Sequence, residues 1–308
     1  MSDQRHVRRR EKVDGRNLSY PPLPEKLAVA VYDNHTHLEI ADGDSPLDYR
    51  EHLDRASSVG VRGVVQVGGD VETSRWSANM AAIEPRMLAA VAIHPNEAPA
   101  YEARGELDNA LAAIAEFARR PRVRAVGETG LDYFRTDESG LAAQLRSFEA
   151  HIEIAKENGL ALQIHDRNAH ADVIRTLNRV GAPERTVFHC FSGDVEMARL
   201  CADNGWYLSF AGTVTFSNAG QTRDALAVTP RSLILVETDA PYLTPTPYRG
   251  RPNAPYLIPT TLRAMAAHLE TDLALLAAQI SSNTELVYGR WDAEPVVRVE
   301  TEPVAGVA

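Results

Sequence analysis

The stretch LALQIHDR, residues 160–167, joins a short apolar run to a histidine. The run Leu160–Ile164 carries no charge and is far shorter than the roughly 18 apolar residues of a membrane span. It is typical of a strand that is buried on both faces of a parallel sheet. His165 follows directly, so this stretch places a polar group at the carboxyl end of a buried strand.

The same arrangement recurs on both sides of this stretch. Short apolar runs alternate with amphipathic segments, which indicates alternating strands and helices. The predicted strands are Leu27–Tyr32, Gly63–Val67, Leu88–Ile93, Val123–Val126, Leu160–Ile164, Thr186–Phe188, Tyr207–Ala211 and Leu233–Val236. Helices are predicted over Leu107–Arg119 and Leu141–Asn158, the second with Leu145, Phe148, Ile152 and Ala155 on one apolar stripe. Gly60, Gly159 and Gly205 stand where a left-handed residue would end a helix.

Polar residues at the strand ends favour a closed barrel over an open doubly wound sheet. Histidines and carboxylates follow most of the apolar runs, and in a barrel all of these ends share one mouth. In an open sheet they would be spread along an edge, too far apart for one metal centre. We therefore predict an α/β chain with a single-domain (βα)8 TIM barrel over residues 28–290. Residues 1–27 are expected to be a flexible N-terminal extension and residues 291–308 a flexible C-terminal tail.

Composition limits the classes of function. The 308 residues include 32 Lys and Arg against 42 Asp and Glu, a formal charge of −10, which argues against a basic coat for nucleic acid. A local phosphate site built around metal ions remains compatible with that charge. Two cysteines, Cys190 and Cys201, exclude a disulfide scaffold and fit a reducing compartment.

The N-terminal arginines raise the question of a targeting signal. Arg8-Arg9-Arg10 resembles the start of a twin-arginine signal, but no apolar segment follows it, so we reject that interpretation. No membrane span is expected, and we predict a cytoplasmic protein, without an obligate protein partner and monomeric.

Candidate metal ligands come from five of the predicted strands. His35 and His37 alternate and so point to the same side of a strand, while His165 and His189 end consecutive strands. A carboxylate such as Glu128 at the end of a buried strand is costly unless it is paired or bound to metal. Asp239 and Glu237 are two positions apart, so both side chains would point to the same side of a strand, and spacing alone does not decide which of them is the metal ligand. Asp239 is nearer the strand end. This set suits two divalent ions, with Glu128 between them.

The chemistry of such a centre favours an anionic substrate. Two divalent ions outweigh two carboxylates, so the mouth would attract a phosphodiester. Metal ions can lower the pKa of water to about 7, and Asp239 is placed to accept its proton as a general base.

Seven motifs together resemble the TatD family of metal-dependent deoxyribonucleases, within the amidohydrolase-like barrels. They occur in the family's order and are DNHTHL (33–38), IHP (93–95), GETGLDY (127–133), HDR (165–167), HCFSG (189–193), ETDAPYL (237–243) and YRGRPNAP (248–255). The resemblance covers about residues 28–290.

This resemblance implies a two-metal 3′–5′ exodeoxyribonuclease that acts on single-stranded DNA. His35, His37 and Asp239 would bind one ion, His165 and His189 the other, with Glu128 bridging; the ions would be Mg, Mn or Zn. The expected catalytic residues are Asp239, Glu128 and Arg167, and the resemblance implies that His94, Arg167 and Ser192 face the phosphate. We add Arg249, which follows the eighth predicted strand, and Tyr133 as further candidate substrate contacts. Arg167 can fork onto phosphate oxygens or form a rim salt bridge, and Tyr133 and Tyr242 either stack a base or pack the mouth.

Four positions depart from the family pattern. Ala92 and Asn96 replace a glycine and a histidine around the His-Pro motif, Thr129 stands for an aliphatic residue, and Ala254 stands for a glutamate. None of them is a proposed ligand, so they bear on substrate contacts.

Other functions stay open at this stage. The same centre could attack a carbonyl, as in an aminoacyl-tRNA deacylase or a small-molecule lactonase or amidase. A non-catalytic binding protein would need a broken metal site, yet every candidate ligand is present. Cys190 has aromatic, neutral neighbours and is expected to be a packed thiol rather than a nucleophile.

Overall fold

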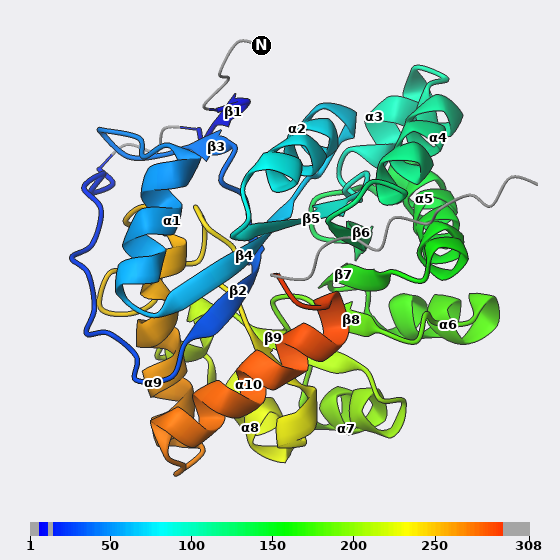
Figure 1. Cartoon of the computed structure of the whole chain (residues 1–308). Helices are drawn as coiled ribbons and strands as arrows, with labels where there is room; N and C mark the ends of the chain where they lie inside the picture. Colours follow the sequence, from blue (N-terminus) through cyan, green and yellow to red (C-terminus); the bar gives the residue numbers. More distant parts are fainter. Residues whose placement is uncertain (1–5, 12–14, 292–308) are drawn as a thin grey trace, which may run out of the picture.

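Eight parallel strands form the centre of the molecule (Figure 1). The structure is a computed structural model that describes residues 6–11 and 15–291. The strands are β2 (Val31–Thr36), β4 (Val61–Val67), β5 (Met87–Val91), β6 (Val123–Asp132), β7 (Ala161–Arg167), β8 (Thr186–Phe188), β9 (Tyr207–Phe210) and β10 (Ile234–Val236). Their order is β10-β9-β8-β7-β6-β5-β4-β2, with parallel neighbours, and the prediction of a TIM barrel is confirmed.

The first and last strands of this sheet meet at the barrel mouth. Thr36 and Ala240 form an isolated parallel bridge, His37 N donates to Ala240 O at 2.8 Å, and Asp239 N donates to His35 O at 2.9 Å. The seam of the barrel is therefore made by the segments that carry three candidate ligands.

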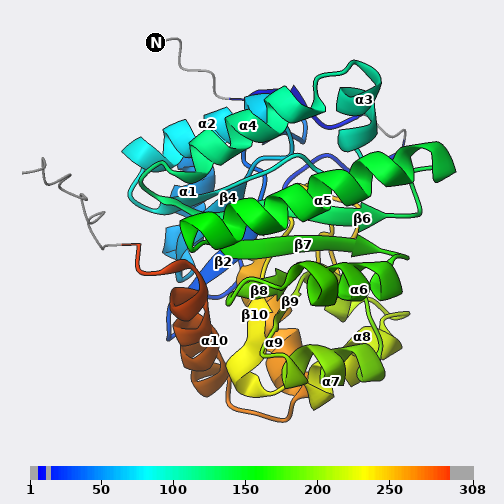
Figure 2. The ribbon, with the colours of Figure 1, turned by 90° about the vertical axis from the view of Figure 1, so that its right-hand side faces the viewer.

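Helices surround the barrel, and Figure 2 shows α5 and α6 outside β6 and β7. The α-helices are α1 (Tyr49–Ser58), α2 (Val71–Ile83), α3 (Ala98–Ala103), α4 (Leu107–Ala118), α5 (Glu138–Asn158), α6 (His170–Val180), α7 (Val195–Asp203), α8 (Gly220–Val228), α9 (Ile258–His268) and α10 (Leu273–Tyr288). Three 3₁₀ turns are η1 (Gly212–Thr215), η2 (Arg231–Leu233) and η3 (Pro255–Leu257).

Local sequence explains where the longest helix begins and ends. Asp137 caps α5, its side chain accepting from Ser139 N, so the helix starts three residues before the predicted Leu141. It ends at Gly159, which has a left-handed φ of 60°, as predicted. Leu145 does not lie in the buried stripe as predicted, because it is 36% exposed beside a groove between α5 and α6.

The barrel interior is a packed core that is closed at the end opposite the mouth. Small and branched side chains fill it. Val287 and Tyr288 from the last turn of α10 pack against these side chains and form, with Trp291, a group that we call the plug. Trp291 completes the plug: it is 6% exposed, stacks on Tyr32 with ring centroids 4.0 Å apart, and donates to Val64 O.

Two terminal predictions need correction. Trp291 was predicted to begin a flexible tail but belongs to the core, and residues 292–308 lie outside the described part. The N-terminal residues were predicted to be loose, yet β1 (Arg8–Arg9) pairs with β3 (Ile40–Ala41) and Leu27 is buried. Residues 1–5 and 12–14 lie outside the description. The first barrel strand also starts later than predicted, at Val31, and extends into the histidine motif.

Candidate metal centre

Strand β2 delivers two imidazoles to the barrel mouth. His35 is within the strand and His37 directly follows it, and their Nε2 atoms lie 3.3 Å apart. The side chain of His35 is fully buried and that of His37 is 10% exposed. The alternation of side chains along β2 therefore brings both rings to the same side, as the sequence predicts.

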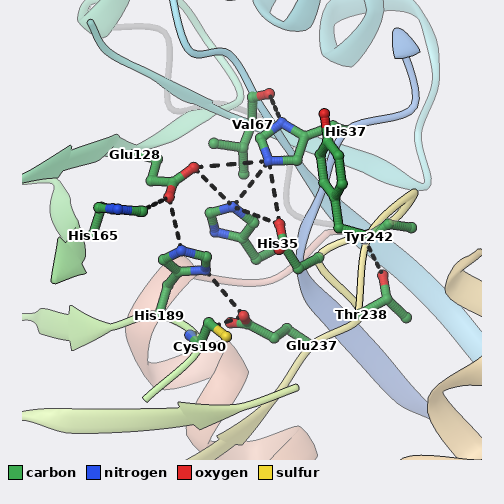
Figure 3. A network of polar contacts seen from close by, with 12 residues as sticks. His35, His37, Val67, Glu128, His165, His189, Cys190, Glu237, Thr238 and Tyr242 are labelled. Atoms are coloured by element: carbon green, nitrogen blue, oxygen red, sulfur yellow. Dashed lines mark hydrogen bonds and ion pairs between the residues drawn. The ribbon is translucent and has the colours of Figure 1, made fainter. Parts of the chain in front are cut away.

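Glu128 lies between two groups of imidazoles. Its Oε2 is 3.6 Å from His35 Nε2 and 3.8 Å from His37 Nε2. Its Oε1 is 2.5 Å from His165 Nδ1 and 2.8 Å from His189 Nε2 (Figure 3). One carboxylate thus faces both groups with different oxygens.

A local irregularity of β6 directs Glu128 into the barrel. The register between β6 and β7 shifts between Val126 and Thr129. A Cβ at Gly127, which has a φ of 158°, would come within 2.5 Å of Gln163 Cβ, and one at Gly130 within 2.0 Å of His165 O. Only glycine permits this close approach, as the sequence predicts.

Asp239 joins the first group, and the structure separates it from Glu237. Asp239 Oδ1 lies 3.5 Å from His37 Nε2 and 3.8 Å from His35 Nε2, with its side chain 14% exposed. Glu237 is fully buried behind His189, where its Oε1 accepts from His189 Nδ1 at 3.0 Å and from Cys190 N at 2.9 Å. The two carboxylates therefore differ in position: Asp239 faces the mouth, and Glu237 lies behind a histidine.

In three of the imidazoles, the ring nitrogen that points away from the donor cluster (the outer nitrogen) contacts an oxygen atom of the protein. Nδ1 of His37 is 2.9 Å from Val67 O, and Nε2 of His165 is 3.1 Å from Asp132 Oδ2. Glu237 does the same for His189. Such contacts orient the ring and, when a cation is bound, leave the inner nitrogen free to ligate it. Within the described chain, His35 Nδ1 is buried without a hydrogen-bond partner.

The electrostatics of the centre favour the binding of positive charge. Burial raises the pKa of Glu128, but the surrounding His189, His94 and His165 outweigh it and hold the pKa well below its usual value. Burial lowers the pKa of His37, yet Asp239 and Glu39 raise it to about 9. At His35, burial and the neighbouring His189 lower the pKa to about 4. The raised pKa values of His37, His165 and His189 mean that protons on these three rings neutralise the carboxylates. A divalent cation would replace these protons, since ligating imidazoles are neutral.

The predicted substrate contacts are spread around the mouth. His94 lies within the donor cluster, with Nε2 3.4 Å from Glu128 Oε1. Arg167 is exposed at the end of β7 and lies over the Phe134 ring at 4.1 Å. Ser192 is exposed nearby, its Oγ 3.4 Å from Asp166 O.

The other two predicted contacts lie farther out. Arg249 is exposed and lies over the Phe216 ring at 4.3 Å. Tyr133 donates its hydroxyl to Asp172 Oδ2 at 2.7 Å and lines the groove between α5 and α6, so it is engaged away from the donor cluster. Tyr242, by contrast, lies against His37, with ring centroids 6.5 Å apart (Figure 3).

Several relevant residues were missed by the sequence reasoning. Asp132 holds His165 and itself accepts from Asn96 Nδ2 at 3.1 Å, so the departure at Asn96 supports a candidate ligand. Phe134, 62% exposed, rather than Tyr133, lies under Arg167. The placement of Asp132 inside GETGLDY, two positions beyond Gly130, was the available signal. Ala254 is fully buried, so its side chain is not positioned for substrate.

The thiol of Cys190 fits its predicted packing role. Burial raises the pKa of Cys190, which leaves the sulfur protonated and unreactive. Cys190 and Cys201 are both free cysteines.

The chain is similar to known proteins over this entire region. The family model of the TatD related DNases matches residues 32–289. The chain belongs to the TatD family. It is 43% identical over 261 residues to the uncharacterized metal-dependent hydrolase TatD of Mycobacterium tuberculosis, covering 83% of this chain and 97% of that one. It is 34% identical to the uncharacterized metal-dependent hydrolase YabD of Bacillus subtilis, covering 84% and 98%.

A solved structure of the family has the same fold. The crystal structure of YJJV, a TatD homolog from Escherichia coli K12, aligns with a TM-score of 0.76 at 26% identity, covering 84% of this chain and 98% of that one. The protein is thus a metal-dependent hydrolase of the TatD family with candidate ligands from histidine, glutamate and aspartate. In residues 6–11 and 15–291, no helix is both long and apolar enough to cross a bilayer.

Proposed function

We propose that this TatD-family hydrolase is a 3′–5′ exodeoxyribonuclease that cleaves single-stranded DNA with two divalent ions, Mg, Mn or Zn. The observation that carries the proposal is the division of donor atoms around Glu128. Its Oε2 faces His35 and His37, while its Oε1 faces His165 and His189. A carboxylate shared in this way suits two cations placed side by side.

The residues around the donors have separable tasks in this proposal. When bound, the ions supply an activated water and neutralise charge on the phosphate. A carboxylate oxygen of Asp239, at the mouth and 14% exposed, accepts the proton of the attacking water. The water oxygen bonds to phosphorus, the P–O3′ bond breaks, and O3′ takes a proton from solvent water and leaves as the 3′-hydroxyl. A nucleoside 5′-monophosphate is released.

Substrate binding is assigned to the rim. His94 has a side chain 19% exposed beside Glu128, so we assign it a contact to the scissile phosphate. Arg167 is exposed and always charged, and its planar fork matches two phosphate oxygens. The pairing of Arg167 with Phe134, and of Arg249 with Phe216, puts cations and aromatic faces together. Single-stranded nucleic acid uses both kinds of contact.

The test is a cleavage assay on a 5′-labelled 20-nucleotide single strand. Purified protein with added Mg or Mn should produce a ladder that shortens from the 3′ end, and a chelator should stop it. His35→Ala should lower the rate by about 100-fold or more, since it removes a ligand. His268→Ala is the matched control, because His268 is an exposed histidine on α9.

Two results would contradict the proposal. Undiminished cleavage by His35→Ala would indicate a contaminating nuclease. Hydrolysis of an activated carboxylic ester or an aminoacyl-tRNA, with no cleavage of the oligonucleotide, would assign the same centre to carbonyl substrates.

A further inference from the structure

We propose that the N-terminal arm, residues 6–11, binds backbone phosphates of single-stranded DNA through Arg9 and Arg10. The inference rests on the proposed function, because it extends the binding site of that substrate beyond the mouth. The arm lies outside the stretch that the family model matches, which begins at residue 32.

The arm is fixed beside the metal centre by its backbone. β1 pairs in parallel with β3, and Figure 1 shows both strands apart from the barrel sheet. Val7 N donates to Glu39 O at 2.9 Å, and Arg10 N donates to Ala41 O at 3.0 Å. Since β3 begins three residues after His37, the arm runs next to a candidate ligand.

Arg10 reaches from the arm to the loop that follows Asp239. Its Nη1 donates to Pro241 O at 2.6 Å, and its guanidinium carbon lies 4.7 Å from the centre of the Tyr242 ring. Tyr242 in turn lies against His37, as Figure 3 shows. One aromatic ring therefore separates the guanidinium of Arg10 from the donor cluster.

Two arginines of the arm, Arg9 and Arg10, have no carboxylate to themselves. Arg10 and Arg16 share the one carboxylate of Asp42, so one of these two charges is uncompensated. Arg8 is paired with Asp70 and also lies 3.8 Å from Glu97. Arg9 is exposed and forms no ion pair with the residues that the structure describes. The exposed carboxylate of Glu11 lies in the same arm, so the feature that favours a phosphate backbone is the unpaired guanidinium of Arg9 together with the shared pairing of Arg10, next to an anion-binding mouth.

The position of the arm complements the other rim arginines. Arg10 over Tyr242 repeats the pairing of Arg167 with Phe134 and of Arg249 with Phe216. β7, which carries Arg167, lies four strands away from β2 in the eight-stranded order, so it is across the barrel. A single strand that crosses the mouth would meet a guanidinium and an aromatic face on both sides.

Binding is tested separately from cleavage by fluorescence anisotropy. The full chain is titrated onto a labelled 20-nucleotide oligo(dT) in a chelator, over a series of salt concentrations. The double variant Arg9→Ala/Arg10→Ala should bind about ten-fold more weakly, with a salt dependence reduced by about 1.4 in log–log slope, as for two lost phosphate contacts. Arg9→Ala alone, which leaves the contacts of Arg10 intact, should give about half of that change in slope.

The matched control is Arg119→Ala/Arg199→Ala. Both residues are exposed, at the end of α4 and on α7, and have no ion pair in the described parts of the chain, and the variant has the same net charge. It should bind within two-fold of the wild type. Thermal unfolding of every variant shows whether the fold is retained.

The outcomes separate this inference from the proposed function. Equal binding by the arm variant and the wild type, no measurable binding by the wild type, or equal competition by polyglutamate would overturn the inference. Binding that depends on the arm, without any phosphodiester cleavage, would support DNA binding by the arm and contradict the proposed nuclease activity. If cleavage occurs, kcat/KM on the 20-mer should fall more in the arm variant than kcat/KM on bis(p-nitrophenyl) phosphate.

Discussion

At the scale of single residues, the centre depends on side chains that hold the candidate ligands from behind. Glu237, Asp132 and the carbonyl of Val67 each engage one nitrogen of a histidine and leave the other directed at Glu128 or Asp239. These partners decide which nitrogen is free, and a neutral imidazole can bind metal only through a free nitrogen. A buried histidine outside the centre affects the stability of the protein instead.

Glu237→Gln should weaken metal binding by about 10- to 100-fold, because an amide holds His189 less firmly in the required tautomer. The measurement is the dissociation constant by competition with a coloured chelator. Glu157→Gln, at an exposed position of α5, is the control and should bind metal like the wild type. An unchanged affinity in Glu237→Gln would show that the contact with His189 is not needed.

His52→Leu should reduce the loss of stability between pH 7 and pH 5. Burial lowers the pKa of His52 to about 3, so it stays neutral in the folded protein while the unfolded chain takes up a proton below pH 6.5. Its contribution to stability is therefore present above pH 6.5 and lost as the pH falls, by about 2 kcal/mol at pH 5. Urea unfolding at both pH values measures this, and an equal loss in the two proteins would contradict it.

At the scale of elements, the two ends of the barrel have separate tasks. The mouth carries the polar groups, and the opposite end is sealed by α10 and Trp291. A Cβ at Gly63 would come within 2.6 Å of the Trp291 indole nitrogen, so the glycine on β4 makes room for this plug. Residues at this end of a barrel act in stability rather than in catalysis.

Trp291→Ala should lower the free energy of unfolding by about 3–5 kcal/mol, because it removes a stacked ring and leaves a cavity. Activity per folded molecule, measured well below the melting temperature, should be unchanged. Leu275→Ala is the control, since Leu275 is 69% exposed and its truncation should cost little. A Trp291→Ala protein as stable as the wild type would show that the plug does not support the barrel.

At the scale of the whole molecule, the candidate centre ties together strands that are far apart in sequence. Candidate ligands come from β2, β6 and β7, from the residue after β8 and from the segment after β10, and two of these segments form the seam of the barrel. A ligand that binds only the folded state stabilises it, by about 2.7 kcal/mol at 100 times its dissociation constant. Metal should therefore act on the fold as a whole.

Saturating Mn or Zn should raise the melting temperature by roughly 5 °C. The rise should be much smaller in His35→Ala and should persist in His268→Ala. Scanning calorimetry with and without a chelator measures it. Equal rises in all three proteins would place the stabilising ion elsewhere.

The sequence by itself determined the architecture and gathered the candidate ligands. Apolar runs that end in His165, His189 or Glu128 are a local pattern, and strand alternation alone aligns His35 with His37. The closed sheet then follows because parallel strands with polar carboxyl ends share one mouth. These features depend on neighbours in sequence, so they could be predicted.

Only the tertiary structure decided which residues contact one another across the molecule. Asp239 and Glu237 have the same parity, and only their distances to His37 and His189 assign one to the mouth and the other behind a ring. The burial of Trp291 depends on Tyr32, 259 positions away, and β1 exists only because β3 offers a free edge. Each of these outcomes is a contact between segments that are distant in sequence. The contact stabilises the protein only after the barrel has folded, so no local sequence pattern predicts it.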